Sequence, residues 1–246
     1  MLVFFAVGFL ILGIVLSASK TAHSDPIYHE VHYPHGEGPF PVVIVLHTSN
    51  GFKTVKRRIS KYTNAGYAVY APDFFKNHGI SHSNRFDTWT IFRKRIEFEL
   101  TEIVGEIKKN PITDNDNIFA VGFSNGGYWA AFLAANGHVN AAAAHYGVWS
   151  WPPDKGWDGY PANYFSDKSN PVLAIHGKRD TVQKPHFVFK QLAIIEDASK
   201  KFEKYFFSDA GHSWDCKPCK KDGHNSVATR KALELTLNLF EKNKRR

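Results

Sequence analysis

The chain has 246 residues, 43% of them hydrophobic and 22% charged, which is an ordinary globular composition. It excludes a disordered, collagen-like or coiled-coil protein and supplies enough apolar residues for a sizeable core. The formal net charge is +8, and most of it lies in residues 200–246, which carry 12 basic and 6 acidic side chains. No nucleic-acid-binding motif accompanies this basic end, so we interpret it as a solvated surface and expect no nucleic-acid partner.

The N-terminal segment, residues 2–18, is uncharged and almost wholly apolar, and the chain turns polar from Ser19. Such a segment is typical of an export signal, with small residues at Ala18 and Ala22 as candidate cleavage points. Its length also reaches the lower limit for a membrane-spanning helix, so an uncleaved anchor is the main alternative and a buried helix the third. We therefore expect residues 1–22 to be a signal peptide or N-terminal membrane anchor. The folded part is then exported, either periplasmic or secreted.

From residue 26 onward, short apolar runs rich in β-branched residues alternate with segments of helical pattern. Such alternation is typical of βαβ units, in which helices join parallel strands. The expected strands are residues 41–46, 68–71, 118–121, 141–146, 172–176 and 202–207. No internal repeat or low-complexity linker interrupts them, so we predict one α/β domain over residues 26–246. Its sheet is expected to be mostly parallel and flanked by helices.

Two helices are clear from the spacing of apolar residues. One runs from Trp89 to Ile107, with apolar residues three or four apart, and Pro111 follows it. This spacing repeats once per helical turn and predicts one buried face. A final helix around residues 227–240 ends before a run of basic residues, and cations are favourable at the C-terminal end of a helix.

The sequence Gly122-Phe123-Ser124-Asn125-Gly126 directly follows an expected strand and precedes a stretch of small residues. This is the pattern G-x-S-x-G between a strand and a helix, which places a serine hydroxyl on a sharp turn above the sheet. The following helix directs its N-terminus at the site, where it favours developing negative charge. Ser124 is therefore the candidate nucleophile, the alternative being a glycine-rich turn with a capping serine.

A serine hydroxyl needs a base to become a nucleophile, and the base needs an acid to fix its tautomer. Where a serine on such a turn is catalytic, the acid and then the base follow it in the chain. Asp180 comes directly after one expected strand and His212 after the next. Both should therefore lie at the edge of the sheet that carries Ser124, and we predict that they complete a catalytic triad. His186 and His224 are the other late histidines, but neither follows a strand.

An oxyanion in a tetrahedral intermediate needs preorganised N–H donors. The first is expected from the backbone of Asn125, the residue after the nucleophile. The second is expected from the loop after residues 41–46, where Ser49 is the first choice and Thr48 the fallback. The alternative interpretation of this loop is an ordinary turn, in which small polar residues are common.

Together these motifs resemble the dienelactone hydrolase family of α/β-hydrolases. The resemblance rests on four stretches, which are residues 62–74, 122–127, 177–180 and 211–212. It implies a single-domain α/β-hydrolase fold with a Ser/Cys-Asp-His triad that acts on ester, lactone or related acyl bonds. This sequence departs from the namesake enzymes, which carry cysteine where Ser124 stands, and this departure favours a serine carboxylesterase over a lactone-specific enzyme.

Two further features border the expected site. Cys216 and Cys219 closely follow His212, and outside the cytoplasm they are expected to form a short disulfide that stiffens the loop of the base. Free thiols and a metal or redox site are the alternatives. An aromatic stretch, residues 149–165, lies between the nucleophile and the acid. Its rings are expected either to line a substrate pocket or to pack the loop onto the domain.

The sequence thus predicts a serine hydrolase that cleaves a carboxylic ester or lactone through an acyl-enzyme. Its expected partner is a small-molecule ester, with membrane attachment only through the N-terminal segment, and no metal or organic cofactor is implied. A peptidase or thioesterase on the same scaffold is one alternative, because the choice of leaving group depends on pocket shape. A non-catalytic binding protein with the same fold is the other.

Overall fold

The computed structural model describes residues 26–150, 159–217 and 224–246, and the expected signal or anchor at residues 1–22 lies outside them. Seven strands form one sheet in the order β1-β3-β2-β4-β5-β6-β7. β1 (His29–His32) is antiparallel to β3, and all other neighbouring pairs are parallel. The parallel strands are β2 (Phe40–Leu46), β3 (Ala68–Pro72), β4 (Thr113–Phe123), β5 (Ala141–His145), β6 (Val172–Gly177) and β7 (Phe202–Phe207).

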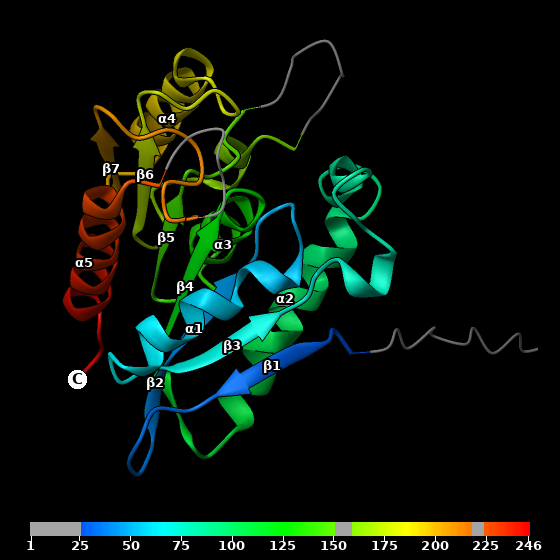
Figure 1. The fold of residues 1–246 in the computed structure, drawn as a ribbon. Coiled ribbons are helices and arrows are strands. Elements are labelled where there is room, and N and C mark those ends of the chain that lie inside the picture. Colours follow the sequence, from blue (N-terminus) through cyan, green and yellow to red (C-terminus); the bar gives the residue numbers. More distant parts are fainter. Residues whose placement is uncertain (1–25, 151–158, 218–223) are drawn as a thin grey trace, which may run out of the picture.

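Helices cover both faces of this sheet (Figure 1). The described part of the chain contains α1 (Lys56–Thr63), α2 (Arg93–Lys109), α3 (Asn125–Ala135), α4 (Pro185–Ala198) and α5 (Ser226–Lys242). α2, α3 and α4 contribute side chains to one buried cluster, and α1 and α5 contribute to a second cluster on the opposite face. The connections also hold short 3-10 turns, at Phe52–Thr54, Lys76–His78, Arg85–Thr88 and Pro161–Tyr164.

The central strands are apolar because helices cover them from both sides. The last five residues of β2 and all five residues of β5 are buried. Near-continuous apolar runs of this kind are expected for parallel strands between two helical layers. The small alanines of β5 leave room for α3, in which all eleven residues are buried. The start of α3 is therefore fixed firmly against the middle of the sheet.

All six strands predicted from the sequence are present, and the predicted α/β fold class is confirmed. The ends of β4 differ most from expectation, because its polar first residues, Thr113 and Asp114, pair with Phe40 and Pro41 before the register shifts. β1 was not predicted. Its four residues are only half-buried, and three of them are polar, so no apolar run marks it.

The two predicted helices are also present, with small differences at their ends. The periodic face that begins at Trp89 enters regular helix only at Arg93, although Trp89 itself is buried. The last helix, α5, extends the predicted range by one residue at its start and two at its end. Among the described residues, no helix is both long enough and apolar enough to cross a membrane.

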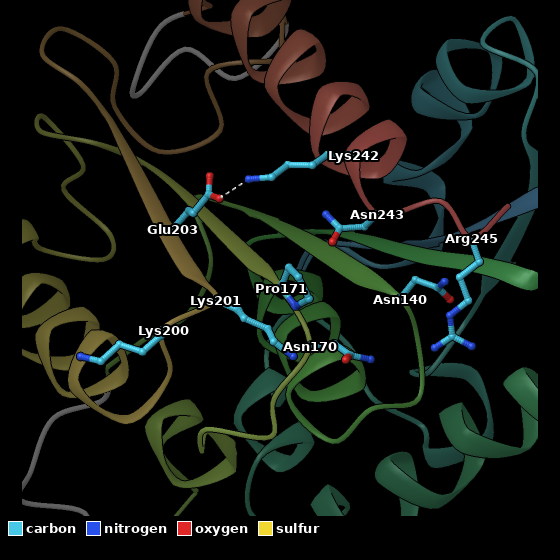
Figure 2. A pocket seen from close by; sticks show the side chains of 9 residues that line it. All are labelled: Asn140, Asn170, Pro171, Lys200, Lys201, Glu203, Lys242, Asn243 and Arg245. Carbon is cyan, nitrogen blue, oxygen red and sulfur yellow. Dashed lines mark hydrogen bonds and ion pairs between the residues drawn. The ribbon is translucent and has the colours of Figure 1, made fainter.

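A hollow of about 450 Å³ opens at the amino ends of β5, β6 and β7 (Figure 2). It is lined largely by the basic end of the chain, including Lys200, Lys201, Lys242 and Arg245, and Lys242 pairs with Glu203 at 3.3 Å. The predicted site residues instead follow the carboxyl ends of parallel strands. The hollow and the predicted site therefore lie at opposite edges of the sheet.

The attachment of α5 to the sheet can be tested at Phe240, which is fully buried and stacks on Phe119 with ring centroids 4.8 Å apart. Phe240→Ala is expected to lower the free energy of unfolding by about 3–5 kcal/mol, because it leaves a cavity between helix and sheet. Val227→Ala on the same helix, where the side chain is 65% exposed, should change it by less than about 0.5 kcal/mol. Urea unfolding followed by circular dichroism measures both, and equal losses would contradict this packing.

Candidate active site

Four segments that carry the predicted site residues meet at one edge of the sheet. They follow β2, β4, β6 and β7, which run parallel and therefore end on the same side. In open α/β sheets this carboxyl edge is where ligands bind. The topology thus brings together residues that are up to 163 positions apart, from Ser49 to His212.

Ser124 lies on the sharp turn between β4 and α3. Its φ of 54° and ψ of −111° fall in a region that residues with a side chain rarely adopt. The turn is also tight, since a Cβ atom on Gly122 would lie 1.8 Å from the carbonyl oxygen of Gly126. A Cβ atom on Gly126 would lie 2.3 Å from the carbonyl oxygen of Leu46. Both glycines of the motif are therefore required by close backbone approach.

Backbone hydrogen bonds tie this strained turn to the neighbouring strands. The N–H of Ser124 donates to the carbonyl of His145 at 3.0 Å, and the N–H of Gly126 donates to the carbonyl of His47 at 2.9 Å. The carbonyl of Ser124 in turn accepts from the N–H of Val148 at 3.2 Å. The ends of β2 and β5 therefore hold the serine in its unusual conformation.

Ser124, His212 and Asp180 are hydrogen-bonded in series. His212 Nε2 lies 2.9 Å from Ser124 Oγ, and His212 Nδ1 lies 2.7 Å from Asp180 Oδ2. When Nδ1–H donates to the carboxylate, Nε2 is left to accept the serine proton. All three residues are buried, with Ser124 only 7% exposed. The structure thus brings the predicted nucleophile, base and acid together in the order that proton transfer needs.

Both oxygens of the Asp180 carboxylate accept hydrogen bonds. Oδ1 accepts the backbone N–H groups of Val182 and Gln183, each at 2.8 Å, and Oδ2 lies 3.2 Å from Nε2 of His176 as well as contacting His212. Burial alone would raise the pKa of Asp180, but the hydrogen bonds from the two histidines outweigh it and hold the pKa well below its usual range. The acid is therefore ionised at neutral pH.

His176 is a contact that the sequence analysis did not predict. It lies within β6, is fully buried, and places Nε2 3.1 Å from the carbonyl oxygen of Gln183 in addition to Asp180. Both neighbours are hydrogen-bond acceptors, so Nε2 must carry the proton. The only sequence signal was a histidine four residues before the acid, which the prediction had counted as part of the strand.

The loop after β7 approaches the sheet closely where it carries His212. A Cβ atom on Gly177 would lie 2.1 Å from the carbonyl oxygen of Ala210, so this glycine at the end of β6 allows the approach. The ring of Tyr146, just after β5, packs edge-on against the His212 imidazole with centroids 4.9 Å apart. The imidazole is therefore held by its own loop, which lies against the end of β6, and by the ring of Tyr146.

The candidate oxyanion donors differ in whether their backbone N–H group already donates a hydrogen bond within the protein. The N–H of Thr48 donates to Thr54 Oγ1 at 3.2 Å. Among the described residues, no hydrogen bond engages the N–H of Ser49 or of Asn125. The side-chain amide of Asn125 lies 3.4 Å from Ser49 Oγ, which brings the two segments together. The geometry thus favours Ser49 over the fallback Thr48 as the second donor.

The aromatic stretch contributes to the core in its described parts. Trp149 is fully buried and Phe165 nearly so, and the hydroxyl of Tyr164 donates to Glu97 Oε1 at 2.5 Å. These three rings therefore pack the segment onto the domain, while residues 151–158 lie outside the described residues.

Cys216 is disulfide-bonded, and Cys219 lies outside the residues that the structure describes. Within those described residues, no group of histidine, cysteine and acidic side chains is arranged to hold a metal ion.

Several solved structures share this fold. A protein assigned as a dienelactone hydrolase from Klebsiella pneumoniae superposes with a TM-score of 0.73 at 19% identity, over 87% of this chain and 92% of its own. A dienelactone hydrolase-like promiscuous phosphotriesterase from metagenomic libraries gives 0.69 at 18% identity, over 87% and 92%. Esterase 2 of Thermogutta terrifontis with bound propionate gives 0.68 at 15% identity, over 87% and 88%. The chain therefore has the α/β-hydrolase fold.

The sequence profile of the dienelactone hydrolase family matches residues 29–244. The chain therefore belongs to the dienelactone hydrolase family and is a hydrolase, and the resemblance inferred from its motifs is confirmed. Among curated proteins, none matches the chain.

The backbone approach at the serine turn can be tested with two glycine substitutions. Gly122→Ala places a methyl group against the Gly126 carbonyl, so it is expected to lower the free energy of unfolding by at least about 2 kcal/mol. Gly105→Ala adds its methyl group on α2, where nothing lies within 4 Å, and should raise stability by about 0.5–1 kcal/mol. Thermal unfolding of both variants checks the assignment, and tolerance of alanine at position 122 would contradict the tight turn.

The lowered pKa of Asp180 predicts how stability depends on pH. Because the folded-state pKa lies below the unfolded value of about 3.9, the contribution of Asp180 is fully present above that value and is lost as the pH falls through the folded pKa. The unfolding free energies of the wild type and Asp180→Asn should therefore differ by at least about 1 kcal/mol at a pH of about 5, and the difference should shrink below a pH of about 4. Urea titrations across this range measure it. A difference that stays constant with pH would contradict the ionised, doubly bonded carboxylate.

Proposed function

We propose that the protein is a serine hydrolase that cleaves a carboxylic ester or lactone through an acyl-enzyme. The observation that carries this proposal is the hydrogen-bonded series from Ser124 through His212 to Asp180 at the carboxyl edge of the sheet. A buried serine that contacts an imidazole, which in turn contacts an ionised carboxylate, is the arrangement that makes a hydroxyl nucleophilic at neutral pH.

In the proposed reaction, Ser124 Oγ attacks the carbonyl carbon of the ester while His212 Nε2 takes the hydroxyl proton. The carbonyl oxygen becomes an oxyanion, which accepts hydrogen bonds from the backbone N–H groups of Asn125 and Ser49. His212 then gives its proton to the leaving alcohol oxygen, and the acyl group stays on Ser124. A water molecule, deprotonated by His212, then attacks the acyl carbon of this acyl-enzyme. The bond from that carbon to Ser124 Oγ breaks, His212 returns the proton to Oγ, and the carboxylic acid is released.

Asp180 acts by orienting the base and by stabilising its charged form. Its ionised carboxylate holds the proton of His212 on Nδ1, so that Nε2 faces the serine, and it stabilises the imidazolium that forms during attack. The two backbone N–H groups and His176 fix the carboxylate in turn. The acid therefore needs no movement during the reaction.

Two observations support an ester as the substrate. The family acts as hydrolases, and one structure of the same fold is an esterase with propionate bound. These features support a carboxylic ester over the peptidase and thioesterase alternatives.

We also propose that the protein is exported. The disulfide of Cys216 supports this proposal, because disulfides persist in oxidising compartments and are rare in the cytosol. The apolar residues 2–18 would supply the export signal or anchor.

The proposed mechanism is tested by labelling the purified protein with a fluorophosphonate and assaying it with a p-nitrophenyl ester. Wild type is expected to be labelled on Ser124, as read by intact mass and peptide mapping. Ser124→Ala is expected to lose the label and to lose turnover by about 10³-fold or more. Ser213→Ala, which removes the hydroxyl of the residue that follows His212 in the chain, serves as the control that keeps the label. A folded wild type that is not labelled would contradict the triad and favour a binding protein with this fold.

A further inference from the structure

A buried ion pair lies beside the proposed base. Arg58 of α1 is completely buried, and its guanidinium donates to the carboxylate of Asp215 through Nε at 2.8 Å and through Nη2 at 3.0 Å. Asp215 lies three residues after His212, in the same loop. Two parallel hydrogen bonds between a guanidinium and a carboxylate fix direction as well as distance. Helix α1 therefore holds the loop of the base in one geometry.

Tyr146 joins this pair to the imidazole itself. Its hydroxyl donates to Asp215 Oδ1 at 2.6 Å and accepts from Arg58 Nη2 at 2.8 Å. Its ring packs against the ring of His212 at 4.9 Å. The same tyrosine thus contacts the base with its ring and the ion pair with its hydroxyl.

Arg58 also contacts the segment that carries the nucleophile. Its guanidinium carbon lies 3.8 Å from the ring centroid of Phe123, the residue before Ser124. A further hydrogen bond runs from Nη1 to the carbonyl of Thr54. The cluster of Arg58, Asp215 and Tyr146 therefore contacts the segments that hold both reacting side chains.

Stability alone is a poor explanation for this cluster. Burial would raise the pKa of Asp215, but the attraction of Arg58 and the hydrogen bonds around the carboxylate hold it at about 2, so the buried pair is charged. Removing two charges from water is costly, and well-packed apolar residues often stabilise a fold as much or more. An ion pair with fixed hydrogen-bond geometry also orients the segments that carry its two side chains.

We propose that Arg58, Asp215 and Tyr146 are positioning residues that hold the His212 imidazole at hydrogen-bond distance from Ser124 Oγ. This inference rests on the proposed function, because it assigns a role in the proton transfer between these two side chains. None of the three residues touches the reacting atoms. They act through the His212 loop and through the ring contact of Tyr146.

The first experiment removes the charge of Asp215 with Asp215→Asn, which keeps its size. Loss of the ion pair lets the His212 loop shift, and displacement of a reacting group by about 1 Å costs on the order of 100-fold in rate. We expect kcat to fall by at least about tenfold while KM changes by no more than about twofold, because a shifted imidazole slows proton transfer and not substrate binding. An unchanged kcat, with an effect confined to KM, would overturn the proposal.

A matched pair of tyrosine variants separates positioning from stability. Tyr146 and Tyr67 are both buried, and each donates its hydroxyl to a carboxylate, that of Tyr67 to Glu241 Oε1 at 2.8 Å near the amino end of β3. Both variants should fold, with the larger shift in melting temperature expected for Tyr146→Phe, because its hydroxyl also accepts from Arg58. We expect only Tyr146→Phe to lower kcat. Equal effects of the two variants on kcat would overturn the proposal.

A double variant tests whether an uncharged cluster can also position the His212 imidazole. Arg58→Met combined with Asp215→Leu fills the site with apolar side chains and removes both charges together, which avoids leaving one charge buried alone. We expect this variant to fold and to keep the low kcat of Asp215→Asn. Wild-type kcat in the folded double variant would overturn the proposal. If the double variant does not fold, the tyrosine pair decides.

A readout that does not depend on turnover keeps this inference separate from the proposed function. The proton shared by His212 Nδ1 and Asp180 gives a low-field proton resonance, which reports on the placement of the imidazole. We expect the resonance to shift or broaden in Asp215→Asn and Tyr146→Phe and to stay unchanged in Tyr67→Phe. If wild type proves inert towards esters yet shows this pattern, the proposed function fails and the positioning role stands. An unchanged resonance in all variants would overturn the positioning role whatever the activity.

Discussion

The strained backbone at Ser124 is the constraint on which the rest of the site depends. A residue with φ of 54° persists only where its surroundings enforce that conformation, and here the ends of β2 and β5 do so through hydrogen bonds to the turn. Those strand ends are themselves fixed because both faces of the sheet are buried under helices. The two helical layers thus fix the sheet, and the sheet fixes the position of the Ser124 hydroxyl.

The parts of the site that sequence reasoning could predict are those with local signatures. The serine turn is marked by two glycines and a preceding strand, and Asp180 and His212 each follow an apolar run that is recognisable on its own. Chain order and parallel topology then place all three at one edge. The structure brings these three side chains into contact, whereas the choice of Ser49 as the second oxyanion donor stays a prediction.

What sequence reasoning missed depends on approach between distant segments. Arg58 and Asp215 are 157 positions apart, and a basic residue in a short helix gives no sign that it will be buried. His176 appears only as a polar residue at the end of a strand until the acid folds back beside it. The edge strand β1 was missed for another reason, since a half-buried strand with polar residues lacks the alternation that identifies strands.

The distance in sequence between the site residues has a consequence for when the candidate site forms during synthesis. Ser124 and His212 are 88 positions apart, and the strand that precedes His212 lies at the edge of the sheet. A growing chain therefore contains Ser124 long before it contains His212. The contact between the two side chains therefore forms only after β7, the last strand in the chain, has joined the sheet. The contact between Ser124 and His212 is thus a report on the assembly of the sheet.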